Sequence, residues 1–158
     1  MSIATLARVP ALAAPLLVLL AGLAGCQGDI SDADIERSAV ALRQVQDAVD
    51  KPGRNELLVD ARSRKEWEAK RIPSAINLAS TQVAGVKGQV DPRLDTFDRL
   101  IVYGDNPGSA PARALTKKLV LTGYRDVRFF PGGILEWEGA GLPTRSNPPT
   151  DATGPLSK

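Results

Sequence analysis

Short apolar blocks recur along the chain, separated by stretches with helical spacing. Blocks at residues 57–61, 75–78, 100–103 and 127–130 are typical of short strands that are buried on both faces of a parallel sheet. Because helical stretches separate the blocks, the pattern predicts an α/β fold. We expect an open parallel sheet of about five short strands with helices on both faces.

The first helix is predicted from its start signal and its spacing. Ser31-x-x-Asp34 has the form of a capping box, and the apolar positions that follow predict a helix over about 32–49. A helical turn is expected at 65–70, where Glu66 and Lys70 are spaced for an i,i+4 ion pair. Glu66 is expected either to cap this turn or to form an ion pair. Two later helices are predicted over about 110–122 and from 132 to about 139–141.

The N-terminal segment has the pattern of an export signal. Arg8 is its one charge, and the apolar run 11–24 leads through small residues to Cys26. A membrane-spanning helix needs ~20 apolar residues, and this run is shorter and contains Pro15. A permanent spanning helix is therefore not predicted.

Leu23-Ala24-Gly25-Cys26 resembles the lipobox of bacterial lipoproteins, in which the cysteine is lipidated, the peptide is cut before it, and the new N-terminus is acylated with a chain such as palmitate. The resemblance implies a signal peptide over 1–25, and a lipidated end with a short tether over 26–29. The alternative is an ordinary buried or unpaired cysteine that happens to follow an apolar run. Gln27 favours, by the same resemblance, an outer membrane position facing the periplasm in a cell with two membranes.

Composition restricts the chemistry of the rest of the chain. Cys26 is the only cysteine, and histidine is absent, which excludes His-based zinc sites, Ser-His-Asp triads and imidazole bases. Without residues 1–25 the chain keeps 19 basic and 18 acidic side chains, so it has no basic field for nucleic acid. No cofactor is predicted.

The length suits one domain over 30–143, and the proline-containing tail 144–158 is predicted to be disordered.

Several motifs occur in the order in which one rhodanese homology domain has them. They are Leu58-Val59-Asp60-Ala61-Arg62, Glu66, Ile72-Pro73-x-Ala75-Ile76-Asn77, Ile101-Val102-Tyr103, Gly123-Tyr124-x-x-Val127 and Gly132-Gly133-Ile134-x-x-Trp137-x-x-Ala140-Gly141-Leu142-Pro143. The chain therefore resembles a single rhodanese homology domain. The resemblance implies sulfur transfer by a cysteine that follows the strand at 101–103, with the persulfide held by backbone N–H groups of the next loop.

The chain departs from this family pattern in that loop. The cysteine position falls on Gly104, or on Asp105 if the gap is placed one residue later, and neither side chain can carry sulfur. Pro107 and Pro111 each remove an N–H donor, and Asp105 adds a negative charge where an anion would bind. We interpret the loop as a vestigial active site that comprises Gly104, Asp105, Asn106, Pro107, Gly108 and Ser109. The family's Gly-His before Ile-Pro is also replaced, by Lys70-Arg71.

Three charged residues are expected to flank this pocket. Asp60 and Arg62 suit a structural ion pair better than substrate groups. Arg113 is the one charge near the loop that could attract an acidic ligand, and we interpret it as a solvated helix residue. Ser109 suits the N-cap of the helix at 110, because no base is available to activate it as a nucleophile.

No metal site is predicted. Asp105 and Asn106 offer oxygen ligands, but both are ordinary turn residues before Pro-Gly. Trp137 shares helical spacing with Ile134 and is expected in the core.

Together these features predict a lipid-anchored, catalytically inactive rhodanese-like module that binds or scaffolds at the bacterial cell envelope. Its partners would be the membrane, through lipid on Cys26, and an envelope protein, and the short tether favours a protein at the same membrane. One alternative is an enzyme that uses a non-thiol group such as Asp105, or a sulfur carrier that relies on a partner's cysteine. Another is a domain kept for surface structure alone.

Overall fold

The structure is a computed structural model that describes residues 29–51 and 55–147. The predicted signal peptide, Cys26 and most of the predicted tail lie outside these residues. In the part of the chain that is described, no helix is long and apolar enough to cross a bilayer.

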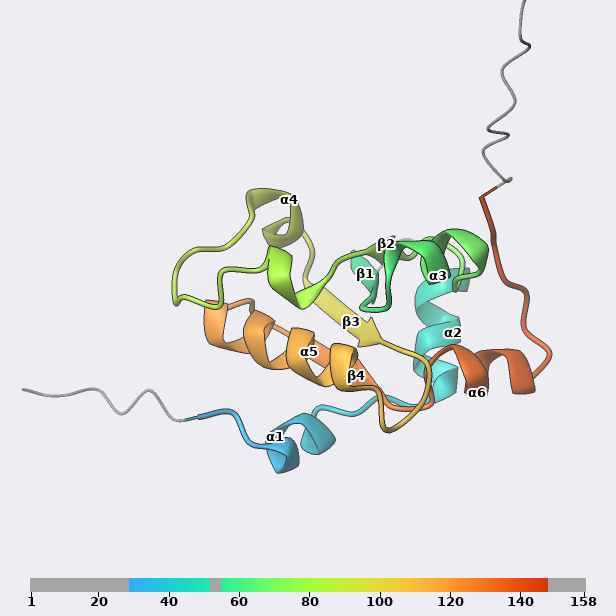
Figure 1. The fold of residues 1–158 in the computed structure, drawn as a ribbon, viewed down its shortest axis with the longest axis horizontal. Helices are drawn as coiled ribbons and strands as arrows, with labels where there is room; N and C mark the ends of the chain where they lie inside the picture. The colour runs from blue at the N-terminus through green and yellow to red at the C-terminus, as the bar shows by residue number, and fades with distance from the viewer. Residues whose placement is uncertain (1–28, 52–54, 148–158) are drawn as a thin grey trace, which may run out of the picture.

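The described chain folds around a parallel sheet, as predicted (Figure 1). The strands are β1 (Glu56–Asp60), β2 (Ile76–Asn77), β3 (Arg99–Tyr103) and β4 (Val127–Phe130), in the order β2-β1-β3-β4. The sheet of the described residues therefore has four strands, whereas about five were predicted. A single parallel bridge between Ala39 and Phe129 adds a short extended contact beside β4.

The prediction of one helix over about 32–49 is wrong, because two shorter helices cover this range. They are α1 (Asp32–Arg37) and α2 (Leu42–Asp50). Between them the backbone is extended and pairs with β4: Val40 N donates to Phe129 O at 2.9 Å, and Phe129 N donates to Ser38 O at 3.2 Å. This long-range pairing interrupts a helical pattern that is continuous in sequence. The capping box at the start of α1 is confirmed.

The remaining helices cover both faces of the sheet. They are α3 (Arg64–Ala69), the 3₁₀ turn η2 (Ser80–Gln82), α4 (Pro92–Asp95), α5 (Ala110–Thr122) and α6 (Gly133–Gly139). Alternate residues of β3 enter two cores: Leu100 and Val102 pack with α5 on one face, while Ile101 and Tyr103 pack with α2 and α6 on the other. Trp137 lies in the second core, as expected.

Of the two roles expected for Glu66, the structure has the cap and not the ion pair with Lys70. The Glu66 carboxylate instead accepts the N–H of Ser63 at 3.0 Å and completes a capping box at the start of α3. The hydrogen bonds from the Ser63 hydroxyl and from the Ser63 N–H lower the pKa of Glu66. Lys70 reaches across to α6, where its Nζ lies 2.6 Å from Glu138 Oε1.

The start of the predicted disordered tail is ordered. Arg71 and Arg145 form an antiparallel bridge, with Arg71 N to Arg145 O at 2.8 Å and Arg145 N to Arg71 O at 2.9 Å. Asn147 N donates to Glu68 O at 2.8 Å. Residues 144–147 therefore form a strap against α3 and the segment after it. The backbone of Arg71, one of the two departures from the family's Gly-His, carries this pairing.

Candidate functional site

The candidate site lies at the carboxyl ends of β1 and β3, where open parallel sheets place their ligands. Asp60 and Tyr103 end these neighbouring strands and are paired in register. The loop 104–109 follows β3 and leads into α5, and Arg62 follows β1. The structure therefore brings together the loop and the flanking residues that the sequence singled out.

Gly104 has no room for a side chain. A Cβ built at this position would overlap the hydroxyl of Ser109, and would lie 2.6 Å from Ser109 Cβ and 3.1 Å from Ala112 Cβ. The side chain of Ser109 therefore fills the space that a residue larger than glycine would need. A cysteine at 104 can be accommodated only if Ser109 moves.

Ser109 is the N-cap residue of α5, as expected, but its side chain does not cap the helix, because its hydroxyl makes no capping hydrogen bond. The residue is only 6% exposed, and its Oγ has no hydrogen-bond partner among the described residues. A buried hydroxyl without a partner costs about 1–3 kcal/mol. The Ser109 side chain thus fills the space beside Gly104, and its hydroxyl is left without a hydrogen bond among the described residues.

The loop uses part of its own hydrogen-bonding capacity to hold its shape. Asn106 Oδ1 accepts the N–H of Gly108 at 2.9 Å, and Asn106 O accepts the N–H of Ser109 at 3.0 Å. Pro107 and Pro111 have no N–H to offer. Four positions that could contribute to an anion cradle are therefore unable to donate to a ligand in this conformation.

The first turn of α6 fixes the loop from the other side. Ile134 N donates to Gly104 O at 2.9 Å, and Leu135 N donates to Asp105 O at 3.1 Å. Gly133 makes this approach possible, because its φ is +59° and a Cβ there would lie 2.5 Å from Gly104 O. The sequence motif Gly132-Gly133 was interpreted only as a helix start, so this role of Gly133 was missed.

Arg113 is not a solvated helix residue, which corrects that expectation. Its guanidinium donates to Pro107 O at 3.0 Å and pairs with Glu36 of α1. It also lies over the Phe129 ring, 5.3 Å from the ring centre. Arg113 therefore flanks the loop by holding one of its carbonyl groups, and its charge is already matched by Glu36.

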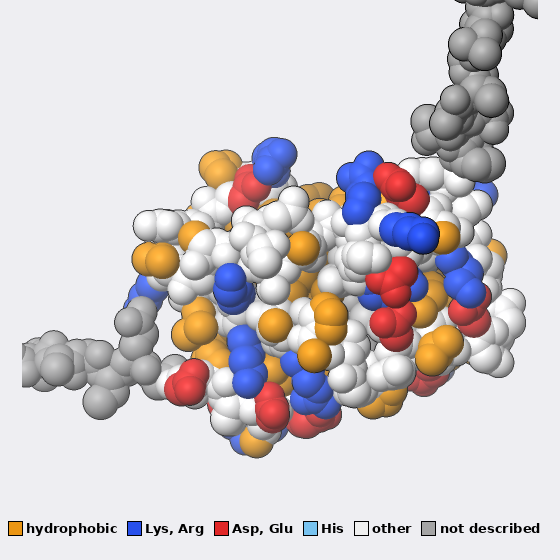
Figure 2. Space-filling model, in the orientation of Figure 1, with side chains coloured by type: hydrophobic (Ala, Val, Ile, Leu, Met, Phe, Trp, Pro, Cys, Tyr) orange, Lys and Arg blue, Asp and Glu red, His pale blue; other side chains and the backbone are white. Residues whose placement is uncertain are grey.

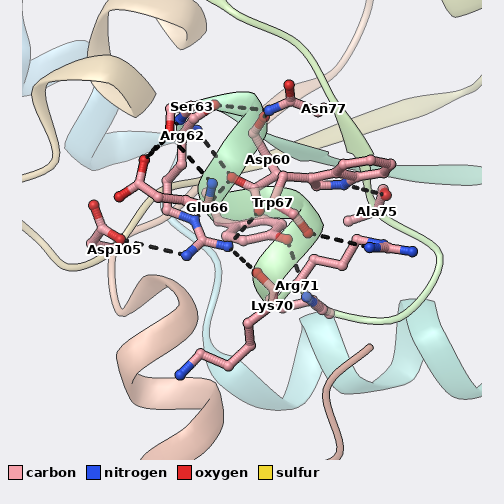
Figure 3. A network of polar contacts seen from close by, with 12 residues as sticks. Asp60, Arg62, Ser63, Glu66, Trp67, Lys70, Arg71, Ala75, Asn77 and Asp105 are labelled. Atoms are coloured by element: carbon pink, nitrogen blue, oxygen red, sulfur yellow. Dashed lines mark hydrogen bonds and ion pairs between the residues drawn. The ribbon is translucent and has the colours of Figure 1, made fainter. Parts of the chain in front are cut away.

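Asp60 and Arg62 form a buried ion pair with two parallel contacts (Figure 3). Arg62 Nε lies 3.0 Å from Asp60 Oδ1, and Nη2 lies 2.7 Å from Oδ2. Arg62 Nη2 also donates to Lys70 O at 2.6 Å. Burial works to lower the pKa of Arg62, but the hydrogen bonds and the charge of Asp60 outweigh it and raise the pKa. The pair thus ties β1 to the segment that the strap holds.

Asp105 lies at the outer edge of this network. Its Oδ1 is 3.6 Å from Nη1 of Arg62, and its side chain is 45% exposed while that of Arg62 is 5% exposed. In Figure 3 the Arg62 guanidinium lies between Asp60 and Asp105. Both carboxylates face the one buried cation of the site, so Arg62 has little charge left to attract an anionic ligand.

The described site contains no thiol and no imidazole. Tyr103 lies beneath it, where its hydroxyl accepts the N–H of Ile72 at 3.1 Å. Burial raises the pKa of Tyr103, which keeps the phenol protonated. Among residues 29–51 and 55–147 no group of three or more acidic, His or Cys side chains could hold a metal ion.

Comparisons with known proteins agree with this fold. The family model described as Rhodanese-like domain matches residues 41–140. Among curated proteins no match was found.

Solved structures give the same result. The BH2092 protein from Bacillus halodurans is 19% identical, with 70% of this chain and 79% of that chain covered and a TM-score of 0.55. The Rhodanese-like domain of the Alr3790 protein from Anabaena sp is 16% identical, with 77% and 88% covered and a TM-score of 0.56. Thiosulfate sulfurtransferase from Pseudomonas aeruginosa is 21% identical, with 72% of this chain but only 21% of that chain covered and a TM-score of 0.53. At these identities the similarity shows the fold alone.

Proposed function

The chain belongs to the rhodanese-like domain family, and we propose that it is a member without sulfurtransferase activity that binds a protein partner at the bacterial cell envelope. In this proposal Cys26 is lipidated, residues 1–25 are removed, and the acyl chains hold the domain on its membrane. Several chains give stable anchoring where one would not.

The proposal rests on one observation, that the Ser109 side chain fills the space beside Gly104. Persulfide chemistry requires a thiolate that attacks the outer sulfur of a donor and keeps that sulfur as the donor's remaining part leaves. Glycine offers no atom for this step, and the Ser109 side chain occupies the space in which such an atom would sit. Arg62 is matched by two carboxylates, which also weakens any attraction for an anionic sulfur donor.

We expect the mature chain to form no thiocyanate from thiosulfate and cyanide above a boiled control. Gly104→Cys alone is expected to be equally inactive, because a side chain at 104 overlaps Ser109. The thiosulfate sulfurtransferase of Pseudomonas aeruginosa is a suitable positive control, since its structure is similar. Thiocyanate from the unaltered chain would contradict the proposal. Activity in Gly104→Cys alone would contradict the role given to Ser109.

Partner binding through the loop can be tested in detergent-solubilised envelope. We expect Asp105→Ala with Asn106→Ala to reduce capture of the bound protein several-fold, because the first removes an exposed charge and the second removes the acceptor of Gly108 N. Gln89→Ala with Asp98→Ala is a matched control at exposed positions near the opposite end of the sheet. If the loop variant retains every protein that the control retains, the loop is not the binding surface.

The proposed lipid anchor can be tested separately from partner binding. The mass of the N-terminal peptide should show a lipidated Cys26 without residues 1–25. An unmodified Cys26 with those residues still attached would remove the anchor from the proposal.

A further inference from the structure

The end of the sheet opposite the candidate site carries a second distinct surface. Because all four strands are parallel, their amino ends gather at one end and the loop 104–109 at the other. Helix α5 starts at that loop and runs back to the amino ends, where Gly123 ends it and Tyr124 follows. In Figure 1 the β3 arrow points toward the loop and α6, whereas the described chain begins beside the opposite end.

Apolar and basic side chains are exposed together at this amino end. Val86 is 49% and Val120 is 36% exposed, and they are two of the three large hydrophobic residues exposed among the described residues. Lys87 and Arg125 are exposed, and neither has an ion-pair partner within the described ranges. Figure 2 shows hydrophobic and basic side chains side by side at this end.

Contacts in the structure hold these residues near one another. Gly88 N donates to Thr122 O at 2.9 Å, which fixes the segment 86–88 against the end of α5. Ile30 lines a hollow of about 340 Å³ together with Val120 and Arg125. We call the surface formed by Ile30, Val86, Lys87, Val120 and Arg125 the basal face.

The chain between this face and the proposed anchor is short. Asp29 follows Cys26 by three positions, and an extended chain spans roughly 3.5 Å per residue, so Asp29 lies within roughly 10 Å of a lipidated Cys26. The residue after Asp29 is Ile30 of the basal face. Any membrane that holds Cys26 therefore lies next to this end of the domain.

We propose that the basal face rests on the bilayer that holds the Cys26 lipid, an inference that depends on the lipid anchor of the proposed function. Exposed valines suit the boundary between headgroups and acyl chains, while lysine and arginine suit lipid phosphates. Two acids, Asp34 and Asp126, also line the hollow, but among the described residues they pair with other arginines and not with Lys87 or Arg125. The domain then stands with its parallel strands pointing away from the membrane, and the candidate site faces the aqueous compartment.

The orientation can be measured on the full lipidated chain in vesicles of phosphatidylethanolamine and phosphatidylglycerol. Cys26 is the only cysteine and is consumed by the lipid, so an introduced cysteine is the single site for a fluorescent label. Val86→Cys reports on the basal face, and Leu135→Cys is the matched variant beside the candidate site, with similar exposures of 49% and 56%. We expect a nitroxide on the lipid headgroup to quench the label at 86 several-fold more strongly than the label at 135.

Equal quenching at the two positions in protein that floats with the vesicles would overturn this orientation and leave the anchor intact. Failure to float, with an unmodified Cys26, would remove both the anchor and the orientation.

Charge reversal gives a second readout. Lys87→Glu with Arg125→Glu should lower quenching at 86 in vesicles rich in phosphatidylglycerol, while Arg43→Glu with Lys65→Glu, at exposed positions on α2 and α3, should not. The same loss in both variants would show that net charge alone, and not the basal face, sets the position.

Discussion

Arg62→Met is expected to destabilise the domain by about 3–5 kcal/mol, because it leaves the buried Asp60 carboxylate without its partner. Asp60 is fully buried, and its carboxylate accepts three hydrogen bonds from Arg62 at 2.7–3.0 Å. One comes from the Arg62 backbone N–H and two come from its guanidinium. The variant also loses the hydrogen bond from Arg62 to Lys70 O. Chemical denaturation followed by the fluorescence of Trp137 and Trp67 would measure the change in the free energy of unfolding.

Two further variants separate the buried pair from exposed charges. Asp105→Asn should cost only about 0–1 kcal/mol, since its contact with Arg62 is 3.6 Å long and half exposed. Asp60→Leu with Arg62→Met should recover part of the loss, because no unpaired charge then stays buried. If Arg62→Met were as stable as Asp105→Asn, the pair would not tie the end of β1 to the segment at Lys70 as described.

Gly133→Ala should also destabilise the domain strongly, by roughly 2–5 kcal/mol. A left-handed backbone costs a residue with a Cβ about 1–2 kcal/mol, and overpacking adds about 1–3 kcal/mol. Here φ is +59°, and the new Cβ would lie 2.5 Å from Gly104 O and 2.6 Å from the carbonyl carbon of Asp105. Both neighbours are backbone atoms, so they cannot rotate away.

Gly139→Ala is the matched control within the same helix. No atom lies within 4 Å of a Cβ at 139, and its φ is not positive, so alanine should be neutral or should stabilise α6 by up to about 1 kcal/mol. Thermal unfolding of the two variants side by side would test the difference. An equal effect at both positions would mean that the approach of α6 to the loop is not as tight as the structure shows.

The fold was largely predictable from local pattern. The strands β1 and β3 contain continuous apolar runs, and β4 is apolar except for Arg128. Helix α5 has both a clear start at Ala110 and a glycine stop at Gly123. The break between α1 and α2 was not predictable, because the pairing of Val40 with Phe129 joins residues that are distant in sequence. The short α4 was missed for a related reason: four residues are too few to establish a helical period.

The position of the candidate site followed from sheet polarity, but its interior did not. The sequence shows that Gly104 carries no thiol, yet nothing in it shows that the Ser109 side chain lies beside Gly104. The preference of serine for N-caps predicted that the Ser109 hydroxyl bonds the helix backbone. In the structure it packs against Gly104 instead. Arg113 was misjudged in the same way, since its partners Glu36 and Pro107 come from separate segments.

The strap has a practical consequence for how partners are sought. The described chain leaves the domain at Asn147, which is bonded to α3 close to Arg71 and the Arg62 network. A label attached at the exposed Ser146 of the strap would therefore lie at the same end of the domain as the loop, where it would obstruct the approach of a binding protein.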